Sequence, residues 1–250
     1  MYIKTTNSTS TLLKELLAKG EWPEGEGFLY AGYQTAGRGQ TGNRWESEAE
    51  KNLLCSVLIK ANCEWFKANG SFYLNVAVSV ALLRTISELG ISELAIKWPN
   101  DIYWQDKKLA GILIENAIIG NKVKYSIAGI GLNVNQTEFT SDAPNPVSMR
   151  QITGKEYDID ALMKSLYTEV QKTLEEDVRE EYKSHLYRRE GLWPFVEREV
   201  SITPTMNADQ QTEGLFMARI EDILPTGEIV LRDQQGKKRK YHFKQVRYVL

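Results

Sequence analysis

The amino-acid sequence predicts an α+β protein in which a mixed β-sheet is backed by helices and followed by a small all-β domain. Up to residue 194, runs of branched residues alternate with segments of helical periodicity. Beyond that point the chain has only short alternating runs broken by Gly and Pro. We therefore expect a larger domain over residues 1–194 and a small β domain over residues 195–250.

The composition narrows the class of protein. With 42% apolar residues, a chain of 250 residues can fill a substantial core. The charge balance of 31 basic against 33 acidic residues is unlike that of a protein that binds nucleic acid or an anionic membrane. Cys55 and Cys63 have no metal-ligand spacing, and no run resembles a secretion signal or a membrane span. We expect a globular, cytoplasmic protein.

The first elements of the predicted sheet domain are a helix and two strands. Leucines at helical spacing over residues 12–17 predict a short helix, with a cap among residues 8–10 and a stop at Gly20. Residues 28–35 and 52–61 are strand-like. The glycine-rich segment between them is therefore a loop that joins two strands.

A second helix and a group of strands follow. Apolar residues recur every three or four positions over residues 72–89, which predicts a mostly buried helix closed by Gly90. Three runs of branched residues then predict strands: residues 94–98, 109–119 and 123–134. Gly120-Asn121 supplies a turn that makes a hairpin of the last two.

The last third of the chain changes character. Residues 159–186 have a long amphipathic pattern that predicts one helix or two. Short alternating runs predict the strands of the small domain: residues 199–202, 214–223, 228–231 and 238–243. The basic run 237–240 fits a solvated hairpin, with an acidic carrier protein as the alternative partner.

The loop Gly37–Trp45 is the first candidate binding segment. Its glycines let backbone N–H groups approach an anion, and Arg38 and Arg44 add permanent positive charge. It lacks the ending of a P-loop, and Gly129-Ile130-Gly131 lacks the third glycine of a dinucleotide fingerprint. Taken alone, the loop is equally consistent with an ordinary glycine-rich connection.

The segment Lys97-Trp98-Pro99-Asn100-Asp101 is the second candidate. It ends a predicted strand, and Lys108 follows seven residues after Asp101, so a turn can bring Asp101 and Lys108 together. A polar β-turn without function is the alternative. Only two histidines are present, which argues against a nucleophilic triad and favours Mg²⁺ over a transition metal.

Taken together, five segments closely resemble the motif series of the biotin protein ligases. They are Ser8-Thr9, Tyr33–Gly39, Lys97–Asp101, Lys108–Glu115 and Gly129–Asn135, which agree in order over residues 7–135. The resemblance implies a class II synthetase-like catalytic domain and an SH3-like C-terminal β-barrel. It also implies a single-function ligase, because the chain starts so near Ser8 that we expect no N-terminal DNA-binding domain.

The activity that the resemblance implies has two steps. Biotin and ATP give biotinyl-5′-AMP and pyrophosphate, and a lysine of a biotin carboxyl carrier protein domain, part of a biotin-dependent carboxylase, then takes the biotinyl group. ATP, biotin and Mg²⁺ are the expected ligands; nucleic acid and membrane are not expected partners, and a homodimer is left open. Related lipoate or octanoyl ligases, and a non-catalytic biotin-sensing module, are the rival interpretations.

The resemblance also assigns roles to residues. Asp101 would accept the proton of the incoming amine. Catalytic residues are Arg38, Asp101 and Lys108; biotin-binding residues are Ser8, Thr9, Ser10, Gln34, Arg38, Gly39, Gln40, Lys108 and Gly111; nucleotide-binding residues are Arg38, Gly39, Gln40, Arg44, Trp45, Asn100 and Asn133; and Asn100 and Asn133 would bind magnesium together with ATP phosphates.

The chain departs from its relatives inside the glycine-rich loop. Many relatives carry arginine where this chain has Gln40 and often at Asn43, and asparagine is common at Ser10. Two charges that commonly retain the adenylate are therefore missing. Because a mixed anhydride hydrolyses readily, we expect residues 37–45 to close over it as a mobile lid.

Overall fold

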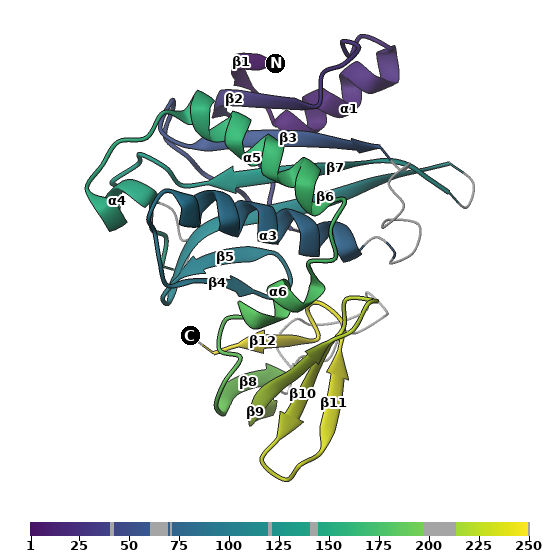
Figure 1. Ribbon diagram of the computed structural model, residues 1–250, viewed down its shortest axis with the longest axis vertical. Helices are drawn as coiled ribbons and strands as arrows, with labels where there is room; N and C mark the ends of the chain where they lie inside the picture. The colour runs from purple at the N-terminus through teal and green to yellow at the C-terminus, as the bar shows by residue number, and fades with distance from the viewer. Residues whose placement is uncertain are drawn as a thin grey trace, which may run out of the picture.

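The larger sheet is mixed and has seven strands in the order β1-β2-β3-β7-β6-β5-β4 (Figure 1). The computed structural model describes residues 1–40, 43–60, 70, 72–119, 122–140, 145–197 and 214–249. The strands of this sheet are β1 (Tyr2–Thr6), β2 (Phe28–Gln34), β3 (Leu53–Lys60), β4 (Leu94–Lys97), β5 (Asp101–Trp104), β6 (Lys107–Ile119) and β7 (Lys122–Leu132). β1 pairs with β2 in parallel and every other pair is antiparallel.

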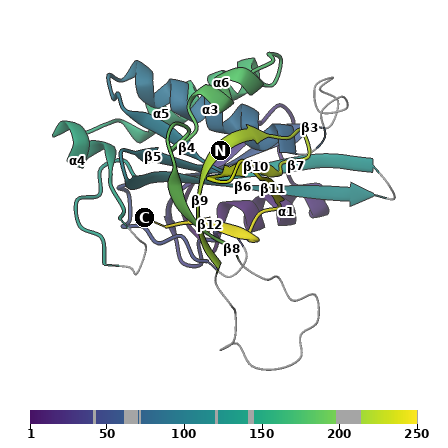
Figure 2. The same ribbon diagram turned by 90° about the horizontal axis from the view of Figure 1, so that it is seen from below.

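Helices cover both faces of this sheet. Helix α1 (Thr9–Lys19) lies on one face, and α3 (Phe72–Glu88) and α5 (Ile159–Thr173) lie on the other (Figure 2). α1 begins after Ser8 and ends at Gly20, whose φ of 71° is the left-handed conformation that glycine adopts easily. The predicted stop at Gly20 is thus confirmed, and Ser8 occupies the N-cap position, although its side chain makes no capping hydrogen bond.

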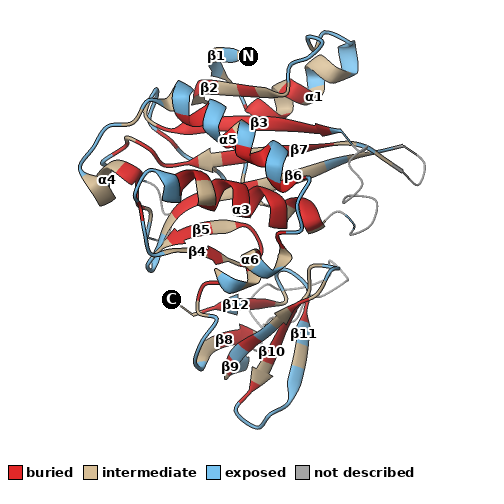
Figure 3. Cartoon of the chain, viewed as in Figure 1, coloured by how far each residue is buried: buried red, intermediate tan, exposed pale blue. Residues whose placement is uncertain are grey.

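The core lies between the sheet and α3. This helix is buried along almost its whole length because the sheet covers one side of it and α5 packs beside it on the same face (Figure 3). Two shorter helices, α4 (Met149–Thr153) and α6 (Arg179–Ser184), complete the set, so the amphipathic segment 159–186 forms two helices. In the described part of the chain, no helix is long and apolar enough to cross a membrane.

The second sheet is antiparallel and lies beside the β4 edge of the first (Figure 1). Its strands, in the order β11-β10-β9-β8-β12, are β8 (Trp193–Glu197), β9 (Gly214–Ile223), β10 (Ile229–Asp233), β11 (Lys238–Tyr241) and β12 (Val246–Tyr248). The indole N–H of Trp98 donates to the carbonyl of Gly227 at 3.0 Å and so ties the two sheets together. One continuous hydrophobic core contains residues of both sheets.

The predicted fold class is confirmed: a mixed sheet backed by helices is followed by a second, antiparallel sheet compatible with an SH3-like barrel. The predicted boundary after residue 194 falls inside β8, which belongs wholly to the second sheet, and the division into two domains stays a prediction. The predicted strand 199–202 and the turn at Gly120-Asn121 lie outside the described residues. Four short strands escaped prediction: β1, β5, β8 and β12.

Candidate active site

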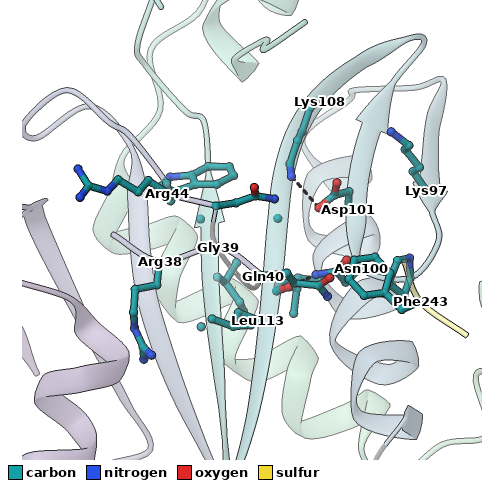
Figure 4. Close-up of a pocket in the computed structure, with 18 of the residues that line it drawn as sticks. Arg38, Gly39, Gln40, Arg44, Lys97, Asn100, Asp101, Lys108, Leu113 and Phe243 are labelled. Atoms are coloured by element: carbon teal, nitrogen blue, oxygen red, sulfur yellow. Dashed lines mark hydrogen bonds and ion pairs between the residues drawn. The ribbon is translucent and has the colours of Figure 1, made fainter. Parts of the chain in front are cut away.

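A cavity of about 580 Å³ lies over the central strands of the larger sheet and reaches the second sheet (Figure 4). Its wall contains every site residue expected from the sequence except Asn133. It also contains residues from the end of the chain, namely Phe243, Val246, Arg247, Tyr248 and Val249. Both sheets therefore build one site.

One end of the cavity is a network of neutral hydrogen-bonding groups. Gln34 Oε1 accepts from the backbone N–H of Thr9 at 2.7 Å and lies 3.1 Å from its hydroxyl. Ser56 Oγ lies 2.9 Å from Thr9 Oγ1 and 2.9 Å from Ser10 Oγ. Ser8, Thr9, Ser10 and Ser56 are all buried. These polar groups are fixed by one another and suit a neutral ligand rich in amides.

Ser56 was not predicted as part of this network. It stands in the apolar strand β3, where one small polar residue gives no sequence signal. In the structure it is fully buried and is the hydroxyl that connects Thr9 with Ser10.

The centre of the cavity holds an ion pair. Lys108 Nζ lies 2.8 Å from Asp101 Oδ1, with both side chains about a quarter exposed (Figure 4). β4 and β5 form a hairpin whose turn contains Pro99 and Asn100, and β5 pairs in turn with β6. The pairing of β5 with β6 brings Asp101 to Lys108, a contact that the seven-residue spacing predicted.

The cavity floor is made by glycines because an indole ring needs the space above them. A Cβ on Gly131 would lie 2.4 Å from Trp45 Cε2, and one on Gly111 would lie 3.1 Å from Trp45 Cζ3. The same ring lies beneath Lys108, whose Nζ is 5.7 Å from its centroid. Trp45 Nε1 and Gln40 Oε1 are buried and have no hydrogen-bond partner among the described residues.

The arginines of the glycine-rich loop point away from the central ion pair (Figure 4). Arg38 makes a bidentate contact with Glu115, with N–O distances of 2.7 and 3.1 Å, and Lys14 reaches the same carboxylate. Arg44 is exposed and pairs with Arg38 only through a backbone bridge. The loop is hairpin-like, and residues 41–42 at its tip lie outside the described part.

Lys97 lies on the opposite side of Asp101 from Lys108 (Figure 4). Its ammonium donates to the hydroxyl of Tyr103 at 2.9 Å and lies 4.6 Å from that ring's centroid and 5.5 Å from the centroid of Tyr248. Burial lowers the pKa of Lys97 to about 8, and Asp101 opposes this shift only in part.

The two asparagines predicted to bind metal and phosphate differ in position. Asn100 lines the cavity, and its amide donates to the carbonyl of Ile112. Asn133 is buried outside the cavity wall, where its amide donates to the carbonyl of Val147 at 3.1 Å. In this structure Asn133 braces the chain after β7 and does not face the cavity.

The fold and the site together define a ligand-binding α+β domain whose cavity has a neutral polar end and a cationic remainder. The chain matches the biotin/lipoate A/B protein ligase family over residues 2–133, which is more than half of its length. It belongs to that family.

Two relatives illustrate the similarity. The chain is 30% identical over 181 residues to the bifunctional ligase/repressor BirA of Escherichia coli, which aligns 72% of this chain with 52% of that protein. It is 34% identical over 137 residues to the biotin–[acetyl-CoA-carboxylase] ligase of Mycobacterium tuberculosis, with 54% and 48% aligned. The chain thus spans about half the length of these relatives.

Solved structures share the whole fold. The biotin protein ligase of Aquifex aeolicus in complex with biotin and ATP has a TM-score of 0.74 at 21% identity, covering 100% of this chain and 98% of that one. The ligase of Leishmania major in complex with biotinyl-5-AMP has a TM-score of 0.63 at 20% identity, covering 96% and 97%. The arrangement of the two sheets in this chain is therefore also found in these solved structures.

Proposed function

We propose that this protein is an ATP-dependent biotin protein ligase. It joins the biotin carboxylate to the α-phosphorus of ATP, with release of pyrophosphate, and then passes the biotinyl group to a lysine of a biotin carboxyl carrier domain. The observation that carries this proposal is the Lys108–Asp101 pair, which lies between the neutral and the cationic parts of one cavity.

The neutral end supports a ligand with amide-like groups. Thr9, Ser10 and Gln34 present hydroxyl and amide groups that can both donate and accept, which matches a ureido ring. The similar structure from Aquifex aeolicus is a complex with biotin and ATP, so a protein of this fold binds both ligands.

The cationic part supports adenylation. Two anions approach each other when a carboxylate attacks a polyphosphate, so catalysis depends on positive charge at the α-phosphate and the leaving pyrophosphate. In this proposal Lys108, an ammonium in the wall of the cavity, holds the biotin carboxylate for attack on the α-phosphorus. Arg38 can leave Glu115 for a phosphate once the ligand brings negative charge, because its side chain is 40% exposed.

Asp101 supports the transfer step. The ε-amine of the carrier lysine is protonated in water and attacks only after losing a proton. Asp101 is the only carboxylate among the described residues that line the cavity, so it is the group that can accept this proton. The amine then attacks the biotinyl carbonyl, the amide bond forms, and AMP leaves.

The residues of this site fit a magnesium ion that is bound mainly by the phosphates of the nucleotide. Among the described residues, no group of three His, Cys, Asp or Glu side chains gathers to hold a metal. Asn100 faces the cavity and Asn133 does not, so Asn100 alone of the two is placed to assist an ion held mainly by phosphates and water. Such an ion, when bound, would neutralise charge on the β- and γ-phosphates.

One assay tests the proposal and its nearest rival. The protein is incubated with ATP, Mg²⁺ and a carrier domain, with biotin or lipoate supplied, and the carrier is weighed by mass spectrometry. We expect the mass of one biotinyl group with biotin and no gain with lipoate. A gain with lipoate alone would make the protein a lipoate ligase, and no gain with a folded enzyme and a competent carrier would refute both.

A further inference from the structure

Lys97 has no role in the chemistry described so far, although it lines the cavity beside Asp101. Among the described residues, no carboxylate lies within 4 Å of its ammonium; the contacts of Lys97 are the hydroxyl and ring of Tyr103 and the ring of Tyr248. A partly buried lysine without an ion pair costs free energy because it loses water and gains no countercharge. An anionic ligand that binds beside such a lysine supplies the missing countercharge and so offsets this free-energy cost.

Two other cations of the cavity are already paired with carboxylates: Lys108 faces Asp101, and Arg38 faces Glu115. Arg44, which also lines the cavity, is exposed to solvent. Lys97 also lies farther along the wall, on the side of Asp101 away from Lys108 and towards the second sheet (Figure 4). A nucleotide whose α-phosphate meets a carboxylate at Lys108 can extend its remaining phosphates over the neutral end, towards Arg38 of the glycine-rich loop, or towards Lys97. The neutral end is the proposed biotin site, and Arg38 points away from the central ion pair, so the geometry favours the direction of Lys97.

We propose that Lys97 is the residue that binds the β- and γ-phosphates of ATP and stabilises the pyrophosphate as it leaves. This inference rests on the proposed ligase function. Tyr103 and Tyr248 act as positioning residues, because their rings hold the lysine stem and its ammonium in place from β5 and β12. The second sheet thereby contributes to nucleotide binding.

A proton-linkage effect follows from the surroundings of Lys97. The charged groups that face it are Asp101, Lys108 and Arg188, and its pKa is lowered to about 8 mainly by burial. Burial raises the pKa of both Tyr103 and Tyr248, so these phenols stay neutral in the same range. A bound phosphate raises the pKa of Lys97, so ATP binding takes up a proton above pH 8, and the affinity for ATP falls as the pH rises through that value.

The experiment compares nucleotide affinities in three variants of the full chain. Dissociation constants for α,β-methylene-ATP and for AMP are measured by calorimetry with saturating biotin and Mg²⁺. In Lys97→Met we expect the affinity for the ATP analogue to fall by about 10- to 100-fold, since hydrogen bonds to charged groups are of that strength. AMP lacks the β- and γ-phosphates, so its affinity should change by less than about threefold.

Two further variants separate charge from packing. Lys97→Arg keeps the charge and should recover most of the lost affinity, and Lys107→Met removes an exposed lysine outside the cavity wall and should behave as wild type. Calorimetry in buffers of different ionisation heat at pH 8.5 to 9 should show proton uptake in wild type and none in Lys97→Met. Unchanged biotin affinity in Lys97→Met shows that the variant is folded.

The failures are distinguishable. If Lys97→Met binds the analogue as wild type does, or loses AMP and the analogue equally, Lys97 does not bind the β- and γ-phosphates. If wild type forms no biotinyl-adenylate from biotin and ATP, the ligase function itself fails, whatever the variants show.

Discussion

The neutral and the charged parts of the cavity differ in how they are held without ligand. In the neutral part, Thr9, Ser10, Gln34 and Ser56 hydrogen-bond to one another and are largely buried. In the charged part, the loop cation Arg38 is exposed and bound to Glu115, and Lys97 has no carboxylate within 4 Å among the described residues.

This difference has a physical cause. Neutral hydroxyl and amide groups satisfy one another at little cost, so a recognition surface made of them can exist before the ligand arrives. Cations that stabilise a reacting phosphate repel one another until an anion binds between them. Without ligand, each cation therefore pairs with a protein carboxylate, stays in solvent or contacts an aromatic ring. The neutral part is therefore preformed, whereas the charged part is completed by the nucleotide.

The largest effect is expected for Asp101→Asn. The amide cannot accept the proton of the carrier lysine, so transfer from preformed biotinyl-adenylate should slow by roughly 100- to 10,000-fold in single-turnover measurements. The deficit should shrink above pH 10, where the lysine amine is already deprotonated. A transfer rate equal to wild type at neutral pH would show that Asp101 is not the base.

Lys108→Ala should come next. It removes the cation expected to hold the biotin carboxylate and leaves Asp101 without its 2.8 Å partner. Biotin-dependent exchange of pyrophosphate into ATP should fall by about 100- to 1000-fold, the usual loss for one group that stabilises transition-state charge. Lys107→Ala is the matched control, because Lys107 is adjacent to Lys108 on β6 but is exposed and lies outside the cavity wall. Unchanged exchange in Lys108→Ala would remove this residue from the site.

Ser56→Ala tests whether the neutral part of the cavity is preformed. The change removes two 2.9 Å contacts, to Thr9 and Ser10, and should raise the KM for biotin about tenfold with little change in the KM for ATP. Ser79→Ala is the control, since this serine is also fully buried but its hydroxyl has no partner among the described residues. An equal rise in both KM values for Ser56→Ala would mean that the network supports the whole cavity.

The sequence predicted contacts correctly where the interacting side chains are close together along the chain. Asp101 and Lys108 are seven residues apart across one turn, so their contact was predictable. Tyr248 and Phe243 come from the far end of the chain, and only the docking of the second sheet brings them to the cavity. The pairing of Arg38 with Glu115 was equally hidden, because it depends on which face of β6 the carboxylate occupies.

Dependence on contacts with distant parts of the chain also explains why the short strands were not predicted. β5 has four residues and follows directly on a proline turn, so its local pattern suggests a turn more strongly than a strand. β1 and β12 are too short for a clear alternation, and pairing with β2 and β8 fixes them. Asn133 differs from Asn100 in position, since its side chain donates to the carbonyl of Val147, and its role at the phosphates stays a prediction.

Gln40→Arg should give the smallest effect and bears on both halves of the cavity. Gln40 lines the wall with a buried amide oxygen that has no partner among the described residues, and its side chain carries no charge. A guanidinium at this position, close to the adenylate phosphate, should slow escape of free biotinyl-adenylate by about three- to tenfold, as expected for one partly solvated charge. Gln40→Met has similar size and no charge, so it should not slow escape. Equal escape from wild type and Gln40→Arg would show that a charge at this position does not retain the intermediate.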